Sequence, residues 1–182
     1  MGDSVGRIGI VPVNAIDAAL LMRLALCLEE RFLFSCSVER TLRLPTTSLN
    51  SVRRQLFLNT LITRAAAMDL PYEGFRLVVT DYDLYKISHQ FVFGEGSEEH
   101  ATAVVSLHRM RTEFYREEPD ENMLFQRLLK ESVHNLGHAM GLRHCQQARC
   151  AMVVSNSIFD TDNKHPHLCE SCERRVRKPM LG

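Results

Sequence analysis

The stretch HNLGHAMGLRH, residues 134–144, carries the strongest signal in this chain of 182 residues. His134 and His138 are four residues apart in a segment that reads as a helix, so their side chains share one helix face. Two imidazoles placed in this way can bind one Zn²⁺ at about 2.0–2.1 Å each. On a continuous helix His144 would lie about 600° beyond His138, but Gly141 can adopt the left-handed conformation that ends helices. We therefore expect a turn at Gly141 that returns His144 as a third ligand.

Histidine pairs at this spacing are also common on ordinary helix surfaces and in protein cores. A third histidine just beyond a helix-breaking glycine favours metal binding over that interpretation. Gly137, inside the predicted helix, leaves room for close packing behind it. A zinc ion with three protein ligands keeps one open position, where it lowers the pKa of water towards about 7 and polarises a carbonyl group.

The residue after the first histidine is Asn135, at the position where zinc hydrolases usually place a general-base glutamate. An amide can hydrogen-bond water but cannot accept its proton at neutral pH. Loss of a general base typically lowers the rate by about 10²–10⁴-fold. Glu131 lies one helical turn earlier, about 6 Å along the axis, which is too far for direct contact without a water bridge. We expect Glu131 to be a solvated helix residue and not a substitute base.

A second cluster follows, in which four of the six cysteines form C-x4-C and C-x2-C pairs separated by eighteen residues: Cys145, Cys150, Cys169 and Cys172. Four thiolates from two short loops are typical of a closed, structural zinc site. Two alternatives stay open, namely disulfides and the replacement of one thiolate by His165 or His167. Cys27 and Cys36 are expected to be core residues. Because Cys145 directly follows His144, a metal bound here would also fix the backbone that delivers the third histidine.

The composition is that of a globular protein with a substantial core, at 45% hydrophobic residues. Lys and Arg balance Asp and Glu at 22 each, which argues against nucleic acid or an anionic membrane as the main partner. MGDSVGRIGIVPV, residues 1–13, lacks the pattern of a secretory signal, and AALLMRLALCL, residues 18–28, is too short to span a bilayer. We expect a cytoplasmic protein. In the reducing cytoplasm, cysteines are more often metal ligands than disulfides.

Apolar and amphipathic segments alternate along the chain up to Gly141. The pattern predicts strands at 7–13, 36–44, 75–81, 91–94 and 102–107, and helices at 14–32, 50–69 and about 119–140. EGSEEHA, residues 95–101, is polar and is predicted to be a loop. Such alternation indicates an α/β domain with a mostly parallel sheet. We predict a single domain over 1–182, with an N-terminal subdomain at 1–141 and a zinc-bound C-terminal subdomain at 142–182.

Taken together, these residues resemble the archaemetzincin family of zinc metallopeptidases, within the metzincin clan. The family motif is H-E-x-x-H-x-x-G-x-x-H-C, followed by x4-C-x-M and, after a spacer, by C-x-x-C. The chain reads HNLGHAMGLRHC, then QQARC, A and M, and later CESC. It matches every motif position between residues 134 and 172 except Asn135. FVFG and VVSLHRM, upstream, also look like family segments.

The resemblance implies two Zn²⁺ ions per chain, a catalytic one on the three histidines and a structural one on the four cysteines. It places Met152 in a Met-turn, an apolar floor beneath the catalytic metal. The implied fold is a metzincin-like twisted mixed sheet with two backing helices, an active-site helix and a small zinc-stabilised C-terminal subdomain. FVFG, residues 91–94, would be the edge strand along the cleft, to which an extended peptide can add.

Three functional hypotheses follow. The first is a monomeric zinc metallopeptidase that hydrolyses peptides or proteins by metal-activated water, with activity weakened or lost through Asn135. The alternative is a catalytically inactive zinc-bearing module that binds a peptide without cutting it. A third is a zinc-dependent hydrolase of other amides, because the motif describes the chemistry better than the substrate. No nucleic acid or membrane partner is expected.

Overall fold

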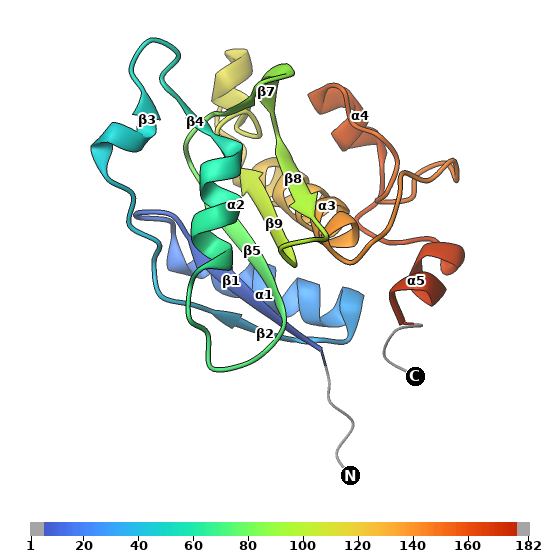
Figure 1. Cartoon of the computed structure of the whole chain (residues 1–182). Helices are drawn as coiled ribbons and strands as arrows, with labels where there is room; N and C mark the ends of the chain where they lie inside the picture. Colours follow the sequence, from blue (N-terminus) through green and yellow to red (C-terminus); the bar gives the residue numbers. More distant parts are fainter. Residues whose placement is uncertain (1–5, 178–182) are drawn as a thin grey trace.

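The computed structural model describes residues 6–177, so the first five residues of the N-terminal stretch lie outside the described part. Its larger sheet has the strand order β2-β1-β5-β9-β8 (Figure 1). These strands are β1 (Arg7–Pro12), β2 (Ser35–Val38), β5 (Phe75–Thr80), β8 (Gly94–Ser97) and β9 (Thr102–Ser106). Neighbours are parallel except β8, which runs antiparallel to β9 at the edge. The predicted mixed α/β sheet is therefore confirmed.

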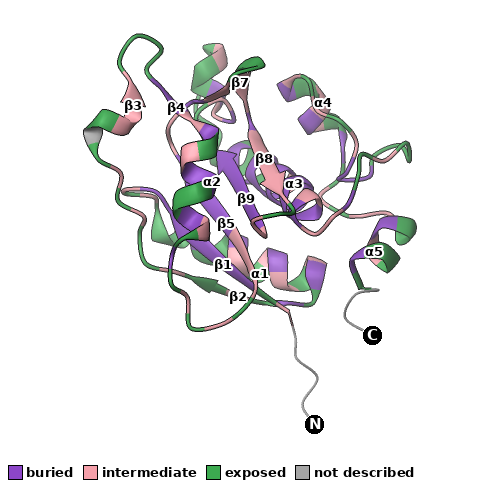
Figure 2. Cartoon of the chain, in the orientation of Figure 1, coloured by how far each residue is buried: buried purple, intermediate pink, exposed green. Residues whose placement is uncertain are grey.

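Helices cover both faces of this sheet. The described helices are α1 (Ala18–Phe32), α2 (Leu58–Ala66), α3 (Glu121–Ala139), α4 (Ile158–Asn163) and α5 (Glu170–Arg177), with short 3₁₀ turns at Thr46–Ser48 and Thr112–Tyr115. Figure 1 shows α2 on the near face and α1 and α3 behind the sheet. Along β1, Ile8 and Ile10 belong to the core under α1 and α3, whereas Val11 belongs to the core under α2. Both faces of the central strands are buried, as the purple colouring of Figure 2 shows.

The helix that carries the first two histidines begins and ends as its sequence predicts. The Asp120 side chain caps α3 by accepting a hydrogen bond from the Met123 amide at 2.9 Å. Gly141 follows with φ of 84°, in the left-handed region that ends helices. Most residues of α3 are buried, so the sheet, α1 and the C-terminal segment hold the helix in place. Within the described residues, no helix is both apolar and long enough to cross a membrane.

The predicted helix at 50–69 is wrong over its first eight residues. That segment forms β3 (Leu49–Asn50) and β4 (Gln55–Phe57), and the helix α2 begins only at Leu58. With β6 (Leu84–Lys86) and β7 (His89–Val92) these strands make a second sheet in the order β3-β4-β6-β7. Gln55 is held there by a 2.9 Å hydrogen bond from its amide to Asp83. Pairing with β6, distant in sequence, therefore overrides the local helical pattern.

The predicted edge strand FVFG is displaced in the structure. Phe91 and Val92 end β7 of the second sheet, and the edge strand β8 begins at Gly94. Residues 95–97, predicted to be a loop, therefore belong to the edge strand. Their sequence gives no apolar signal because β8 needs small residues: a Cβ on Gly96 would overlap the carbonyl oxygen of Asn135 and lie 2.7 Å from Cβ of His138. The glycines let β8 lie directly against α3.

We expect Gly96→Ala to destabilise the protein by about 1–3 kcal/mol, because the new methyl group must push β8 away from α3. Urea unfolding measures the change in the free energy of unfolding. Glu95→Ala is the matched control, since Glu95 pairs with Lys86 in a partly exposed ion pair, which contributes about 0–1 kcal/mol. Equal stability of the two variants would contradict the close approach of β8 and α3.

Candidate metal centre

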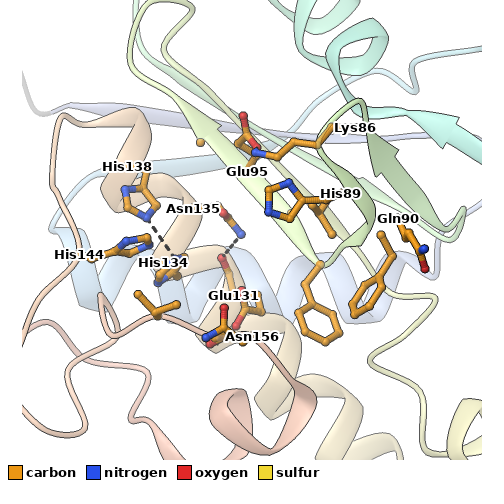
Figure 3. A pocket seen from close by; sticks show the side chains of 17 residues that line it. Lys86, His89, Gln90, Glu95, Glu131, His134, Asn135, His138, His144 and Asn156 are labelled. Carbon is orange, nitrogen blue, oxygen red and sulfur yellow. Dashed lines mark hydrogen bonds and ion pairs between the residues drawn. The ribbon is translucent and has the colours of Figure 1, made fainter.

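Three histidines converge at one end of the cavity, as Figure 3 shows. His134 and His138 project from α3, and the turn at Gly141 brings His144 back towards them. One ring nitrogen from each histidine lies within 4.8 Å of the other two. The Nε2 atoms of His134 and His138 are 3.1 Å apart. The structure thus brings together the three residues that the sequence motif singled out.

Backbone carbonyls orient two of these rings. Nδ1 of His134 lies 2.8 Å from the carbonyl oxygen of Ala151, and Nδ1 of His138 lies 2.8 Å from that of Leu142. A carbonyl oxygen only accepts, so each Nδ1 carries the proton and each Nε2 presents a lone pair. Two lone pairs that face each other repel unless a cation lies between them. Tetrahedral ligands at Zn–N distances of about 2.0–2.1 Å are separated by about 3.3 Å. The histidine arrangement therefore fits a zinc ion.

The electrostatic surroundings keep the imidazoles of His134 and His138 neutral. Burial, together with the ammonium group of Lys164, lowers the pKa of His134 to about 4. Burial also lowers the pKa of His138. At neutral pH both rings are therefore unprotonated at Nε2, the form that binds a metal.

Gly141→Ala should weaken zinc binding and destabilise the chain. A side chain at a φ of 84° is strained by about 1–2 kcal/mol, and its Cβ would lie 2.9 Å from Oε1 of Glu98. The turn that delivers His144 would have to move. Zinc affinity, measured by competition with a chromogenic chelator, reports the displacement. Arg143→Ala, an exposed position in the same turn, is the control and should leave the affinity unchanged.

The histidines border a cavity of about 540 Å³. Its other lining residues come from the β6–β7 hairpin, from β8 and from the segment 154–156. Asn135 also lines the cavity and is only 2% exposed. Its side-chain Nδ2 donates a 2.8 Å hydrogen bond to the backbone oxygen of Glu131. The site therefore holds an amide, which cannot accept a proton, beside the three imidazoles.

Glu131 contradicts our prediction of a solvated helix residue. It is 3% exposed, lines the cavity, and forms a 2.9 Å ion pair with Nζ of Lys164. Oγ1 of Thr161 donates a hydrogen bond to it at 2.8 Å. Burial raises the pKa of Glu131, but the Lys164 ammonium and the hydrogen bond from Thr161 together favour the charged form, and the pKa lies below its ordinary value. The carboxylate is therefore ionised. Both partners lie about thirty residues away in sequence, so no local pattern could have revealed them.

The four predicted cysteines also meet, in the lobe that follows His144. Their sulfur atoms all lie within 4.8 Å of one another, and neither His165 nor His167 belongs to this cluster. Sγ of Cys145 is 3.8 Å from Sγ of Cys169, and Sγ of Cys150 is 3.9 Å from Sγ of Cys172. A disulfide requires about 2.05 Å, whereas tetrahedral thiolates around zinc are about 3.8 Å apart. This spacing fits a metal ion and not the disulfide alternative.

Backbone contacts tie this cysteine cluster to the histidines. The amides of Gln147 and Cys169 each lie 3.3 Å from a cluster sulfur, so they can stabilise thiolate charge. The Cys145 amide donates a 3.0 Å hydrogen bond to the carbonyl oxygen of Met152. Met152 is fully buried, and a Cβ on Gly137 of α3 would overlap its sulfur atom. Gly137 therefore permits the close packing that we predicted.

The remaining cysteines behave as expected. Cys27 and Cys36 are partly buried and pack against the main core. Neither belongs to a group of potential metal ligands among residues 6–177.

Comparisons with known proteins agree with this geometry. The model of peptidase family M54 matches residues 50–178. The archaemetzincin of Methanocaldococcus jannaschii is 37% identical over 172 residues, 94% of this chain and 93% of that protein. The archaemetzincin of Thermococcus kodakarensis is 48% identical over 102 residues, a match that covers 56% of this chain and only 55% of that protein.

A solved structure shares the fold over nearly its whole length. The crystal structure of archaemetzincin from Methanopyrus kandleri superposes with a TM-score of 0.83 at 28% sequence identity, covering 98% of this chain and 97% of the other. The family model spans well over half of the chain, and a relative that is more than 30% identical covers nearly all of it. This chain therefore belongs to peptidase family M54, the archaemetzincin family of zinc metallopeptidases.

Proposed function

We propose that the chain binds two Zn²⁺ ions and acts as a peptidase whose activity is weakened or lost through Asn135. The observation that carries this proposal is the facing pair of Nε2 lone pairs, 3.1 Å apart, on His134 and His138. Their protons are held on Nδ1 by backbone carbonyls, so the pair needs a cation. Membership of a peptidase family makes peptides or proteins the substrates.

In this scheme His134, His138 and His144 hold the first zinc ion. That ion would supply Lewis acidity, which activates water and polarises the peptide carbonyl. Among the described residues, the edge strand β8 pairs with a neighbouring strand on one side only, and an extended peptide can hydrogen-bond to its other side. Asn135 can orient a water by hydrogen bonding but cannot take up its proton. Proton transfer to the leaving amine therefore lacks its usual agent.

The second zinc ion would bind to the four clustered cysteines and stabilise a C-terminal subdomain at 142–182. Met152 would form the apolar floor behind the histidines. Such thiolate ligands suit the reducing cytoplasm that we predict. That location, the division at residue 141 and a monomeric state are parts of the proposal.

Asn135 also favours a second candidate, a peptide-binding module without turnover. The cavity and the edge strand would still receive a peptide, and the metal could hold its carbonyl or carboxylate group. The two candidates share the fold and the metal sites. They differ only in whether the bound peptide is cut.

Metal content and turnover on the same preparation test the proposal. We expect two zinc ions per chain by elemental analysis, and slow cleavage of fluorescence-quenched peptides that stops when His138 is replaced by Ala. Peptide binding with no product after prolonged incubation would favour the module. Equal zinc content in the unaltered chain and in the His138→Ala variant would mean that the histidines bind no zinc. That result would contradict both candidates.

A further inference from the structure

The cavity beside the three histidines has a polar group on its wall that the peptidase scheme does not use. Phe91, Phe93 and Val154 give it apolar surface, and the two phenyl rings meet edge to face with centroids 5.6 Å apart. Figure 3 shows Glu131 between Asn135 and Asn156. A carboxylate in such surroundings requires an explanation, because buried charge is costly unless it is fully partnered.

The partners of Glu131 satisfy only one of its two oxygens. Oε1 accepts the hydrogen bond from Oγ1 of Thr161 at 2.8 Å and forms the ion pair with Nζ of Lys164 at 2.9 Å. Within residues 6–177 no side chain or backbone amide donates a hydrogen bond to Oε2. The side chain is 4% exposed and lines the cavity. Oε2 is therefore an acceptor that a ligand in the cavity can use.

The charge balance indicates which donor would be selected. Lys164 neutralises Glu131, and Lys86 pairs with Glu95 at the other side of the cavity. With both acids paired, the wall offers hydrogen-bond acceptance without net negative charge. A cationic side chain gains little from such a wall, while an uncharged donor loses less hydration on entry. The apolar surface suits the methylene groups of that side chain.

We propose that Glu131 determines the specificity of this cleft, by accepting a hydrogen bond at Oε2 from an amide-ended side chain of the peptide, of which glutamine is the type. The inference rests on the proposed function, because it assumes that a peptide occupies the cavity beside the histidines. Methionine, of similar length and without a donor, would leave the oxygen unpaired. The Gln peptide gains a hydrogen bond to a charged group, whereas the Met peptide does not. This difference should make the Gln peptide bind about tenfold to a hundredfold more tightly than the Met peptide.

The test uses the full zinc-loaded chain and short labelled peptides that differ only in carrying Gln, Met, Leu or Lys at one position, which is moved along the peptide. Fluorescence anisotropy gives each dissociation constant without turnover. At one position we expect Gln to bind about tenfold to a hundredfold more tightly than Met, and Lys no more tightly than Gln. Equal affinities for Gln and Met at every position would overturn the proposal, as would a clear preference for Lys.

A double variant shows whether the preference depends on Glu131. Glu131→Leu combined with Lys164→Met replaces the buried ion pair by apolar groups, a change that is often tolerated. The preference for Gln over Met should vanish in it. Asp162→Asn is the matched control, because Asp162 joins α3 to α4 through Arg127 but does not line the cavity. The Asp162→Asn variant should keep the preference for Gln. If the preference depended only on tight packing between α3 and α4, both variants would lose it. If the double variant does not fold, the peptide series on the unaltered chain still decides.

Hydrolysis by the Asn135→Glu variant separates this inference from the proposed function. Cleavage without a preference for Gln would leave the peptidase proposal standing and overturn the role of Glu131. A preference for Gln in binding, without cleavage by that variant, would support the role of Glu131 in a peptide-binding module.

Discussion

Asn135→Glu is expected to raise kcat/KM for peptide hydrolysis by about 10²–10⁴-fold, the usual contribution of a general base. Asn135 lines the cavity that contains the histidines, so a carboxylate there would be placed to act as the general base of the proposed reaction. Glutamate cannot donate the hydrogen bond that Asn135 now gives to the backbone oxygen of Glu131, so its side chain is free to turn into the cavity. The measurement is cleavage of quenched peptides at equal zinc content.

Asn135→Gln is the matched control for this gain. It has the length of glutamate and fits the same space, but its amide still cannot accept a proton. We expect the Gln variant to remain as slow as the unaltered chain. If Glu and Gln at position 135 give the same low rate while both bind peptide, the residue is not limiting, and the binding-module candidate gains instead.

The metal ligands could be predicted from sequence because each set is nearly local. Three histidines lie within eleven residues, and a helix followed by a glycine turn is enough to bring them together. The cysteine pairs could be predicted for the same reason, because the two members of each pair are separated by only a few residues in one loop. Distances of 3.1 Å between imidazole nitrogens and 3.8 Å between sulfurs agree with the spacing of ligands around a tetrahedral zinc ion.

The edge strand and the second sheet could not be predicted because their causes are distant in sequence. β8 has the sequence GEGS. Glycine is needed there because α3, some forty residues later, lies too close for a side chain. Residues 50–57 have a helical pattern, yet β4 pairs with β6 nearly thirty residues away. The pairing of Glu131 with Lys164 is of the same kind. Local periodicity carries no information on contacts of this sort.

Cys172→Ser should have the largest effect on stability. Cys172 is 4% exposed and contributes one of the four clustered sulfurs. Structural zinc contributes on the order of 10 kcal/mol of binding free energy in small domains, so loss of a thiolate should exceed the ~1 kcal/mol typical of a single substitution. We expect the cysteine-bound zinc to be lost and the midpoint of urea unfolding to fall to a markedly lower urea concentration. Cys27→Ser, which lies outside the cluster, should retain both ions.

The same variant should also weaken zinc binding at the histidines. Cys145 follows His144 directly, and the carbonyl oxygen of Ala151 orients His134. Both lie on the segment that the four sulfurs hold, so release of the second ion frees one ligand and disorients another. By contrast, α4 remains tied to α3 by the ion pair between Arg127 and Asp162.

Amide hydrogen exchange distinguishes these two parts of the lobe. Exchange in Cys172→Ser should accelerate over residues 142–157 and 165–177 and change less over α4, where buried ion pairs persist. Uniform acceleration across the lobe would mean that the zinc ion alone organises it. An unchanged exchange pattern with two zinc ions still bound would show that the cysteine cluster does not support the histidine site, and that the two metal centres are independent.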